Sequence, residues 1–438
     1  MLLSALLTSL ALLSPPQAPD LRSAIQADYA DHLAALFEHF HRHPELSFLE
    51  HETAARLSTE LRTAGVRVTE GVGGTGVVGI LRNGEGPRIL VRADMDGLPL
   101  AEETGLPYAS EAIYQAGDGT SIPIMHACGH DVHMTAMVGT ARWMNANRDR
   151  WSGTILFVGQ PAEERIGGAR AMLGDGLYER FGVPDQALAL HVSAGSPAGK
   201  IQLRGGLTAS SSDSVDIVVH GIGTHGASPH RGKDPIYIAS QIVIALQGLV
   251  SRELAPLEPG VVTVGSFHAG SKHNIISSVA RLELTVRSDS DETREKLLLG
   301  IERIAEHIGR ANGLPDDKLP EVIRTLESTP PTENDPALAE RLLDTFTAHF
   351  GSQGLYHEER SGMGAEDFAY FVKTPERVPG AYFQVGGTPQ ADIDAAKAGG
   401  APIPGHHSPF FRIDPQPSVT RGVEAMVVAL LELMPAEG

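Results

Sequence analysis

Apolar residues near the N-terminal end of the chain recur at helical spacing. Leu33, Leu36, Phe37 and Phe40 fit one face of a helix, and a second helical run follows to about Ala64. Shorter apolar runs separated by Gly come next, and such runs are typical of strands. The predicted strands cover residues 77–82, 88–94 and 154–159, with a helical pattern between the last two over 131–146. Strands that alternate with helices predict an α/β layered sheet with functional residues on loops at strand ends.

The composition changes at residues 196–206, which are rich in Gly, Ser, Pro and Lys. A β-α-β-β-α pattern follows this segment. Its predicted elements are strands at 214–220, 261–268 and 281–288 and helices at 235–254 and 292–311. Such a unit forms a small α+β domain, with two helices on one face of an antiparallel sheet. Beyond about residue 316 the sequence predicts a helix over 336–350, a strand near 381–385 and an apolar helix over 418–434. We therefore predict a catalytic domain in two parts, 21–200 and 314–438, with an inserted domain at 201–313.

The first thirteen residues are almost wholly apolar, and they are too few to span a bilayer. They lead into Ser-Pro-Pro-Gln-Ala, an ending typical of a signal peptide. We expect residues 1–20 to be a signal peptide and the protein to be periplasmic or secreted. Because no Lys or Arg precedes Arg22, a cytoplasmic location is the alternative. No later stretch reaches the roughly 18 consecutive apolar residues of a membrane helix, so we expect no membrane contact of the mature form.

Composition narrows the possible functions. A chain of 438 residues is too long for one ordinary core, which favours two domains and a cleft between them. The formal net charge is -19, and no segment concentrates Lys and Arg, so nucleic acid is excluded as a partner. Cys128 is the single cysteine, and it forms no disulfide within the chain. Its thiol therefore needs another explanation.

A dense group of polar residues, Met-His-Ala-Cys-Gly-His-Asp-Val-His, occupies residues 125–133 just before a predicted helix. In an extended backbone, Cys128 and His130 project to the same side and reach one metal ion. A Cys-x-His pair alone is more often a buried cysteine beside helix-capping residues. Three histidines within this short segment favour a metal site instead.

Two adjacent carboxylates, Glu163 and Glu164, follow the predicted strand at 154–159. In an irregular turn such neighbours point in different directions, so one can bind a metal ion while the other acts as a general base towards water. The alternative is a solvated pair of glutamates. His191 ends a strand-like segment at 186–192, and His406 and His407 lie in a late loop. Together with Cys128 and His130, these residues supply about five ligands, enough for two divalent ions.

At these positions the chain resembles the aminoacylase, carboxypeptidase G and hippurate hydrolase family of metallopeptidases. Within that family it is most similar to the branch of hippurate hydrolase and the indole-acetyl-amino-acid amidohydrolases. The motifs that carry the resemblance are His-Arg-His-Pro-Glu-Leu (41–46), Arg-Ala-Asp-Met-Asp-Gly-Leu-Pro (92–99), His-Ala-Cys-Gly-His-Asp (126–131), Pro-Ala-Glu-Glu (161–164), Gly-Ala-Glu-Asp-Phe (364–368) and His-Ser-Pro (407–409). Six ordered motifs make the resemblance specific, and it covers nearly the whole chain after residue 20.

The resemblance implies a zinc-peptidase-like layered α/β catalytic domain with an inserted, smaller α+β domain of ferredoxin-like topology that serves as dimerisation or lid domain. It also implies two divalent metal ions, zinc or manganese, and a homodimer formed through the inserted domain. The implied site residues are Cys128, His130, Glu164, His191 and His407 as metal ligands, Glu163 as catalytic base, His225 as oxyanion stabiliser, and Asn274 and Arg287 as binders of a substrate carboxylate. His407 is preferred to His406 because it directly precedes Ser-Pro. The wider family has His-x-Asp where this chain has Asp94-Met95-Asp96, a departure that its branch shares.

The function that the resemblance implies is hydrolysis of the amide bond of N-acyl amino acids, either hippurate-like or N-acetylated, by metal-activated water. A metallo-exopeptidase, acting as a dipeptidase or carboxypeptidase, is the first alternative, because it uses the same metals and base. The second alternative is a non-catalytic metal-binding interaction protein. The joint presence of a base and five ligand candidates speaks against that last interpretation.

Overall fold

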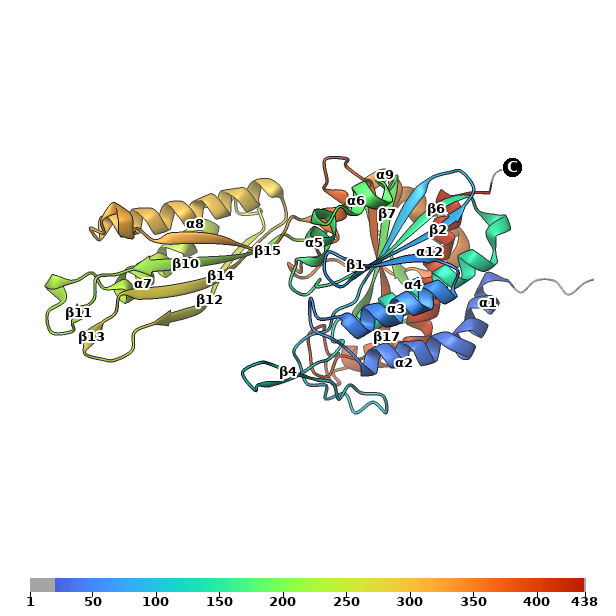
Figure 1. Ribbon diagram of the computed structural model, residues 1–438, viewed down its shortest axis with the longest axis horizontal. Helices are drawn as coiled ribbons and strands as arrows, with labels where there is room; N and C mark the ends of the chain where they lie inside the picture. The colour runs from blue at the N-terminus through green and yellow to red at the C-terminus, as the bar shows by residue number, and fades with distance from the viewer. Residues whose placement is uncertain (1–19, 437–438) are drawn as a thin grey trace, which may run out of the picture.

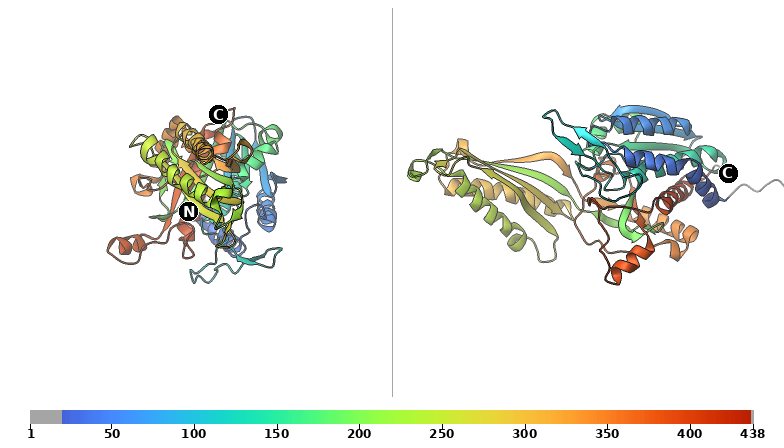
Figure 2. Two further views of the ribbon diagram at one scale, coloured as in Figure 1. Left: turned by 90° about the vertical axis from the view of Figure 1, so that its left-hand side faces the viewer. Right: turned by 90° about the horizontal axis from the view of Figure 1, so that it is seen from below.

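The computed structural model describes residues 20–436. The predicted signal peptide falls outside these residues except for Asp20. The described chain forms two domains, a larger one that contains both the first and the last described residues and a smaller, elongated one that projects from it (Figures 1 and 2). None of the helices in this part of the chain combines the length and apolar character needed to cross a membrane.

The larger domain is built on a seven-stranded mixed sheet. In spatial order its strands are β1 (Arg67–Val72), β2 (Gly76–Asn83), β6 (Gly153–Gln160), β3 (Arg88–Asp94), β7 (Gln186–Pro197), β17 (Gly380–Thr388) and β8 (Ile201–Gln202). The four central strands β6, β3, β7 and β17 run parallel, whereas β1, β2 and β8 pair antiparallel with their neighbours. Parallel strands place their carboxyl ends along one edge of the sheet, which is where α/β proteins build their sites. A small hairpin, β4 (Ile113–Gln115) and β5 (Ser121–Pro123), lies apart from this sheet.

Helices cover both faces of the large sheet. One face packs against α1 (Leu21–Asp28), α2 (Ala34–Arg42), α3 (His51–Thr63), α4 (His130–Ala146), α9 (Pro336–Phe350) and α12 (Pro415–Leu433). The other face packs against α5 (Gly168–Gly174), α6 (Leu177–Phe181) and α10 (Ala369–Val372). A further helix, α11 (Gln390–Lys397), follows β17. Because both faces are covered, the central strands are apolar on both sides: Val91 belongs to one core and Leu90 to the other.

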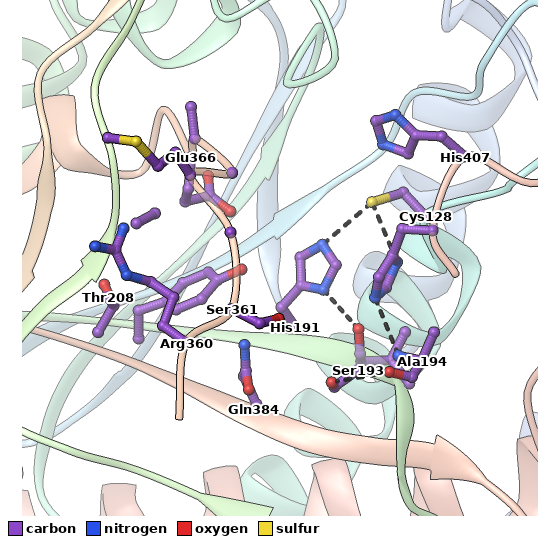
Figure 3. Close-up of a pocket in the computed structure, with 18 of the residues that line it drawn as sticks. Cys128, His191, Ser193, Ala194, Thr208, Arg360, Ser361, Glu366, Gln384 and His407 are labelled. Carbon is purple, nitrogen blue, oxygen red and sulfur yellow. Dashed lines mark hydrogen bonds between the residues drawn. The ribbon is translucent and has the colours of Figure 1, made fainter. Parts of the chain in front are cut away.

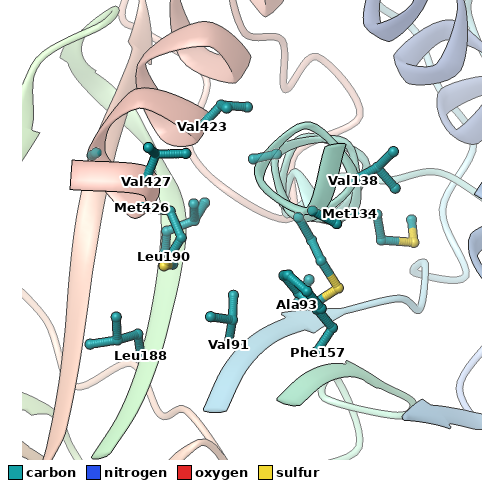
Figure 4. Close-up of a cluster of buried hydrophobic side chains, with 14 of the residues drawn as sticks. Val91, Ala93, Met134, Val138, Phe157, Leu188, Leu190, Val423, Met426 and Val427 are labelled. Carbon is teal, nitrogen blue, oxygen red and sulfur yellow. The ribbon is translucent and has the colours of Figure 1, made fainter. Parts of the chain in front are cut away.

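Helix α4, which begins at His130, is buried along nearly its whole length. It lies between the sheet and α12, with Met134 and Val138 of α4 and Val423 and Val427 of α12 in one apolar cluster (Figure 4). Gly139 allows the close approach of the two helices, since a Cβ there would lie 2.6 Å from Val423. The last helix of the chain thus packs directly against the helix that starts in the candidate site.

The smaller domain has its own antiparallel sheet and its own core. Its chain order is β10 (Ser212–His220), α7 (Pro235–Gly248), β12 (Gly260–Ala269), β14 (Val279–Ser288), α8 (Asp291–Ala311) and β15 (Glu321–Thr329). The strands lie in the order β12-β14-β10-β15, which gives a βαββαβ unit of ferredoxin-like topology and confirms the predicted fold class. Both helices pack on one face of the sheet. A short pair, β11 (Thr224–His225) and β13 (Ile275–Ile276), forms the end farthest from the large domain (Figure 1).

The chain crosses between the two domains at two adjacent segments. β9 (Gly206–Ala209) leads into β10, β16 (Thr332–Asn334) follows β15, and the two short strands pair antiparallel. The small sheet includes β15, which lies beyond residue 313, where the sequence analysis ended the inserted domain. The inserted sheet therefore runs from Ser212 to Thr329.

Candidate metal centre and active site

A cleft of about 870 Å³ opens at the carboxyl ends of the central strands. Both domains line it. The larger domain contributes, among others, Cys128, Glu163, Glu164, His191 and His407, and the smaller one contributes Val261, Thr285 and Arg287. Figure 3 shows Cys128, His191 and His407 on one side of this cleft and Arg360 and Thr208 on the other.

The turn before α4 brings Cys128 against His191. Gly129 has φ +84°, and a Cβ at this position would lie only 2.2 Å from Val192, so only glycine fits between the two ligand-bearing segments. The Cys128 sulfur lies 3.5 Å from Nε2 of His191. Ligand atoms of Cys128, Glu164 and His407 all lie within 4.8 Å of one another. The structure therefore brings together a thiol, a carboxylate and two imidazoles from four separate segments.

The turn after β6 directs Glu163 and Glu164 into the same site. The carboxylate of Asp96 accepts the backbone N–H of Glu163 at 3.0 Å and that of Glu164 at 3.1 Å, which fixes the turn from beneath. The Glu164 carboxylate then lies 3.3 Å from Nε2 of His407 and 3.9 Å from Nε2 of His130. The Glu163 carboxylate groups with Glu366 and Asp367, and it also groups with His130 and Glu164, in each case within 4.8 Å. Both neighbouring carboxylates therefore reach His130.

Several buried polar atoms of the site lack a hydrogen-bond partner among residues 20–436. His130 donates Nδ1–H to the backbone oxygen of Asp96 at 2.7 Å, and its Nε2 is left without a partner. Oε1 of Glu164 is likewise buried and unpaired within this part of the chain. His191 donates Nδ1–H to the carbonyl of Val192, so its Nε2 is an acceptor, and the Cys128 sulfur is its partner at 3.5 Å. Buried unpaired acceptors are costly, and a divalent cation with nitrogen, oxygen and sulfur ligands satisfies all of them.

Two further histidines lie close to the site with both ring nitrogens engaged. His133 accepts the N–H of Val192 at Nε2 and donates Nδ1–H to Asp94. His406 accepts the N–H of Ala194 at Nε2, so its Nδ1–H faces the Cys128 sulfur at 3.6 Å. His407 adopts φ +63°, an uncommon conformation for a non-glycine residue, and its Nε2 faces Glu164. The geometry thus separates His407 from its neighbour His406.

The electrostatics of the site are strongly negative. Arg92 is fully buried and binds three carboxylates, those of Asp94, Glu366 and Asp367. Burial, followed by the charges of Glu366 and Glu164, raises the pKa of Glu163 well above its usual range. Burial also raises the pKa of Glu164 to about 8, against the opposing effect of His130. Cations bound here remove this cost, because an opposite charge favours the ionised carboxylate.

Three predicted site residues belong to the inserted domain, and the structure places only one of them in the cleft. Arg287 lines the cleft, and its Nε donates to Oγ1 of Thr285 at 3.2 Å. His225 and Asn274 lie together in an exposed group around β11 and β13, at the end of the inserted domain farthest from the large sheet (Figure 1). Within one chain they are therefore remote from Glu163.

Sequence reasoning assigned no role to several residues that shape the site. Asp96 holds the glutamate turn, Arg92 balances the carboxylates around Glu163, and His406 faces the Cys128 sulfur. Arg92 and Asp96 stand in one of the recognised motifs, and Glu366 stands in another. Their place in these motifs could have marked them as site residues. It gave no information on which side chain or backbone group each of them binds.

Comparison with known proteins fits this geometry. Residues 90–399 match the model of peptidase family M20/M25/M40. The chain belongs to this family. The hippurate hydrolase of Campylobacter jejuni is 37% identical over 334 residues, which are 76% of this chain and 83% of that protein. Thermostable carboxypeptidase 1 of Saccharolobus solfataricus is 35% identical over 351 residues, which are 79% of this chain and 83% of that protein.

A solved structure with the same fold is that of a protein described as binding two metal ions. The YXEP protein of Bacillus subtilis, described as a dinuclear metal binding peptidase of the M20 family, has a TM-score of 0.71 at 28% identity. The similarity covers 94% of this chain and 99% of that one. Together with the clustered ligand atoms, these findings identify the chain as a dinuclear metal-dependent M20 hydrolase acting on amide bonds.

Proposed function

We propose that this M20 hydrolase cleaves the amide bond of N-acyl amino acids, with hippurate-like and N-acetyl amino acids as the substrate class. The observation that carries the proposal is the position of Glu163, a buried carboxylate beside the unpaired ligand atoms of His130 and Glu164 and in the same cleft as Arg287. A carboxylate-bearing amide fits such a cleft, because one end needs a cation and the other needs a base next to water.

The metal ligands in this proposal are Cys128, His130, Glu164, His191 and His407. Two divalent ions held by this set supply Lewis acidity, which lowers the pKa of water and polarises the amide carbonyl. The thiolate favours zinc, a borderline-soft ion, whereas the carboxylate and imidazole ligands also suit manganese. We propose zinc or manganese as the resident metal.

Glu163 acts as the general base and then as the general acid. Its carboxylate takes a proton from the attacking water, and the same proton passes to the nitrogen of the leaving amino group as the C–N bond breaks. Arg92 supports this role by binding Glu366, so that the carboxylates behind Glu163 are partly neutralised. Arg287 binds the substrate carboxylate through its guanidinium, which forms no ion pair with any residue of 20–436.

His225 and Asn274 contribute to the site of a second copy of the chain, within a homodimer formed through the inserted domain. Nδ1 of His225 accepts the N–H of Ala227 at 3.0 Å, which leaves Nε2 as the ring nitrogen that can donate. A developing oxyanion is stabilised by such a preorganised donor. The exposure of both residues and their distance from Glu163 within one chain support their use across a dimer.

The test is hydrolysis of N-benzoylglycine and a panel of N-acetyl amino acids by purified protein, first stripped of metal and then reloaded with zinc or manganese. Metal-dependent release of free amino acid supports the proposal, and the Glu163→Gln variant is the matched control for contaminating activity. Absence of turnover across the panel, with two metal ions bound per chain, contradicts it.

A carboxypeptidase activity is the second candidate, favoured by the similarity to thermostable carboxypeptidase 1 of S. solfataricus. The two activities differ in what lies on the acyl side of the scissile bond. Free dipeptides carry an ammonium group there, whereas N-acyl amino acids carry none. A higher kcat/KM for dipeptides than for the matching N-acetyl amino acids assigns the enzyme to the second class.

A further inference from the structure

Glu50 is a fully buried carboxylate that lies outside the cleft and has no part in the chemistry described above. It precedes α3, in the segment that follows the His-Pro-Glu-Leu motif. Its Oε1 accepts two backbone N–H groups, that of Phe48 at 2.9 Å and that of Ala162 at 2.8 Å. Its Oε2 accepts the hydroxyl of Thr75. All the contacts of this side chain are therefore inside the protein, and one of them joins the active-site turn.

Ala162 directly precedes the proposed base. It has φ +49°, in the left-handed region that non-glycine residues rarely adopt. Such a conformation persists only when the surrounding structure holds it in place. The Ala162 carbonyl accepts the N–H groups of Gly167 and Gly168, and its N–H is held by Glu50. Both ends of this strained peptide are thus fixed by hydrogen bonds.

Glu50 and Asp96 together bind three consecutive N–H groups of the turn. Glu50 takes that of Ala162, and Asp96 takes those of Glu163 and Glu164. The two carboxylates approach from different segments of the chain, one before α3 and the other after β3. A backbone bound in this way at three successive positions cannot turn the Cα–Cβ bond of Glu163 away from the site without breaking a charge-assisted hydrogen bond.

Stability alone gives no reason for a carboxylate at this position. A buried charge carries a large desolvation cost, and apolar residues of similar volume often replace buried ionic groups with no loss of stability. Glu50 also fixes Phe48, another left-handed residue with φ +63°, whose ring packs beside Gly167 at the far end of the same turn. Glu50 thus contacts the turn directly at Ala162 and, through Phe48, supports it at Gly167.

We propose that Glu50 is a positioning residue that holds the peptide at Ala162 so that the Glu163 carboxylate faces the reacting amide. The inference rests on the proposed function, in which Glu163 is the base. Glu50 acts through hydrogen-bond acceptance at a fixed place, and its charge is secondary. Displacement of a catalytic group by about 1 Å costs up to about a hundredfold in rate.

The experiment compares Glu50→Gln with Glu50→Asp in the metal-loaded enzyme. Gln keeps an acceptor oxygen at the right distance and turns its NH2 towards the Thr75 oxygen, so kcat stays within a few-fold of wild type. Asp keeps the charge but is shorter, so it loses the Ala162 N–H, and kcat falls about ten- to a hundredfold with KM and metal content nearly unchanged. A Glu50→Asp enzyme with wild-type kcat, or a Glu50→Gln enzyme as slow as Glu50→Asp, overturns the proposal.

Two controls separate positioning from loss of stability. Thr75→Val removes the hydroxyl that Glu50 accepts at Oε2 and leaves the hydrogen bond to Ala162 in place, so it keeps kcat near wild type. Ile25→Ala lowers the melting temperature through a cavity in α1, in the core away from the turn, and it also leaves kcat unchanged. A loss of kcat in Ile25→Ala equal to that of Glu50→Asp, at equal melting temperature, also overturns the proposal.

A double-mutant comparison tests whether Glu50 acts through Glu163. Added to Glu163→Gln, the Glu50→Asp change has little further effect on kcat, because the group it positions is already lost. A full multiplicative loss shows a separate role and overturns the inference. If Glu163→Gln retains wild-type turnover, the assignment of the base fails first, so failure of the proposed function is distinguished from failure of this inference.

Discussion

Asp94 accepts a hydrogen bond from the Nδ1–H of His133 across 2.5 Å in the fully buried layer beneath the metal ligands. The other ring nitrogen of His133 accepts the N–H of Val192, the residue that follows His191. His133 therefore has no nitrogen left for a metal ion, although it is grouped with His130 and His191 within ligand distance. It supports the strand that carries a ligand.

We predict that His133→Asn lowers the free energy of unfolding by about 1–3 kcal/mol, since it disrupts the buried hydrogen bonds of the ring to Asp94 and to the N–H of Val192. Urea denaturation of the metal-free protein measures this change. Two metal ions per chain are still expected, because no ligand is removed. The matched variant His191→Asn, on the neighbouring strand, loses bound metal. Equal metal loss in both variants would assign His133 to the centre as well.

His406 and His407 offer a second matched pair. His407→Ala is expected to lose one of the two ions, because its Nε2 is the atom that faces Glu164. His406→Ala keeps both ions but weakens metal affinity by about 10–100-fold, the usual effect of removing a donor to a ligand. Elemental analysis after dialysis against graded chelator concentrations measures both. The reverse order of metal loss would exchange the roles of the two histidines.

Arg287→Gln is expected to raise KM by about ten- to a hundredfold, because charge-assisted hydrogen bonds contribute about 1.5–3 kcal/mol. The kcat value changes less, since the carboxylate lies away from the scissile bond. The chemical control is an N-acyl amino acid amide, which has no carboxylate. Wild type should discriminate against it and the variant should not; undiminished discrimination by the variant would exclude Arg287 as the carboxylate binder.

The pH dependence of stability follows from His41, which lies 2.7 Å from Asp131 and also contacts Glu102. Burial lowers the pKa of His41, but the hydrogen bonds to these two carboxylates outweigh it and raise the pKa from 6.5 to about 9. The neighbouring Tyr108 ring is neutral in this range, and buried His126 is unprotonated, because burial lowers its pKa to about 4. The folded state thus binds the His41 proton more tightly than the unfolded state.

The stabilisation by His41 is therefore complete below about pH 6.5 and is lost as the pH rises through about 9. We expect the difference in unfolding free energy between wild type and His41→Asn to be larger near pH 6 than near pH 9.5. Urea denaturation at both pH values measures it. A difference that grows with pH would show that His41 is neutral in the folded protein.

Apolar periodicity predicted the central elements because these are buried on defined faces. The strand expected at 88–94 is β3 without a shift, and the helix expected at 131–146 is α4 to within one residue. Most of the missed strands are no longer than four residues, but two longer ones, β1 and β15, were missed as well. Both are sheet edges with a single buried residue each and exposed residues such as Arg67 and Glu321, so they lack the apolar alternation that identifies a strand.

The candidate ligands could be predicted because their residue types are unusual in combination. The residues that position them could not, because a carboxylate that accepts backbone N–H groups leaves no pattern in the sequence. Glu50 and Ala162 are 112 residues apart, and Asp96 and Glu163 are 67 apart. Such pairs become visible only when the sheet has brought β3, β6 and the start of α3 together.

The packing of α12 against α4 has a consequence for synthesis of the protein. The ribosome makes α12 after all the other elements that the structure describes, yet this helix covers α4, the helix that starts at His130. His407, too, is translated long after Cys128, because most of the chain beyond Cys128 precedes it. The inserted domain has its own core and can fold while the chain is still growing. Nascent chains should therefore acquire a folded inserted domain well before they can acquire a complete metal centre.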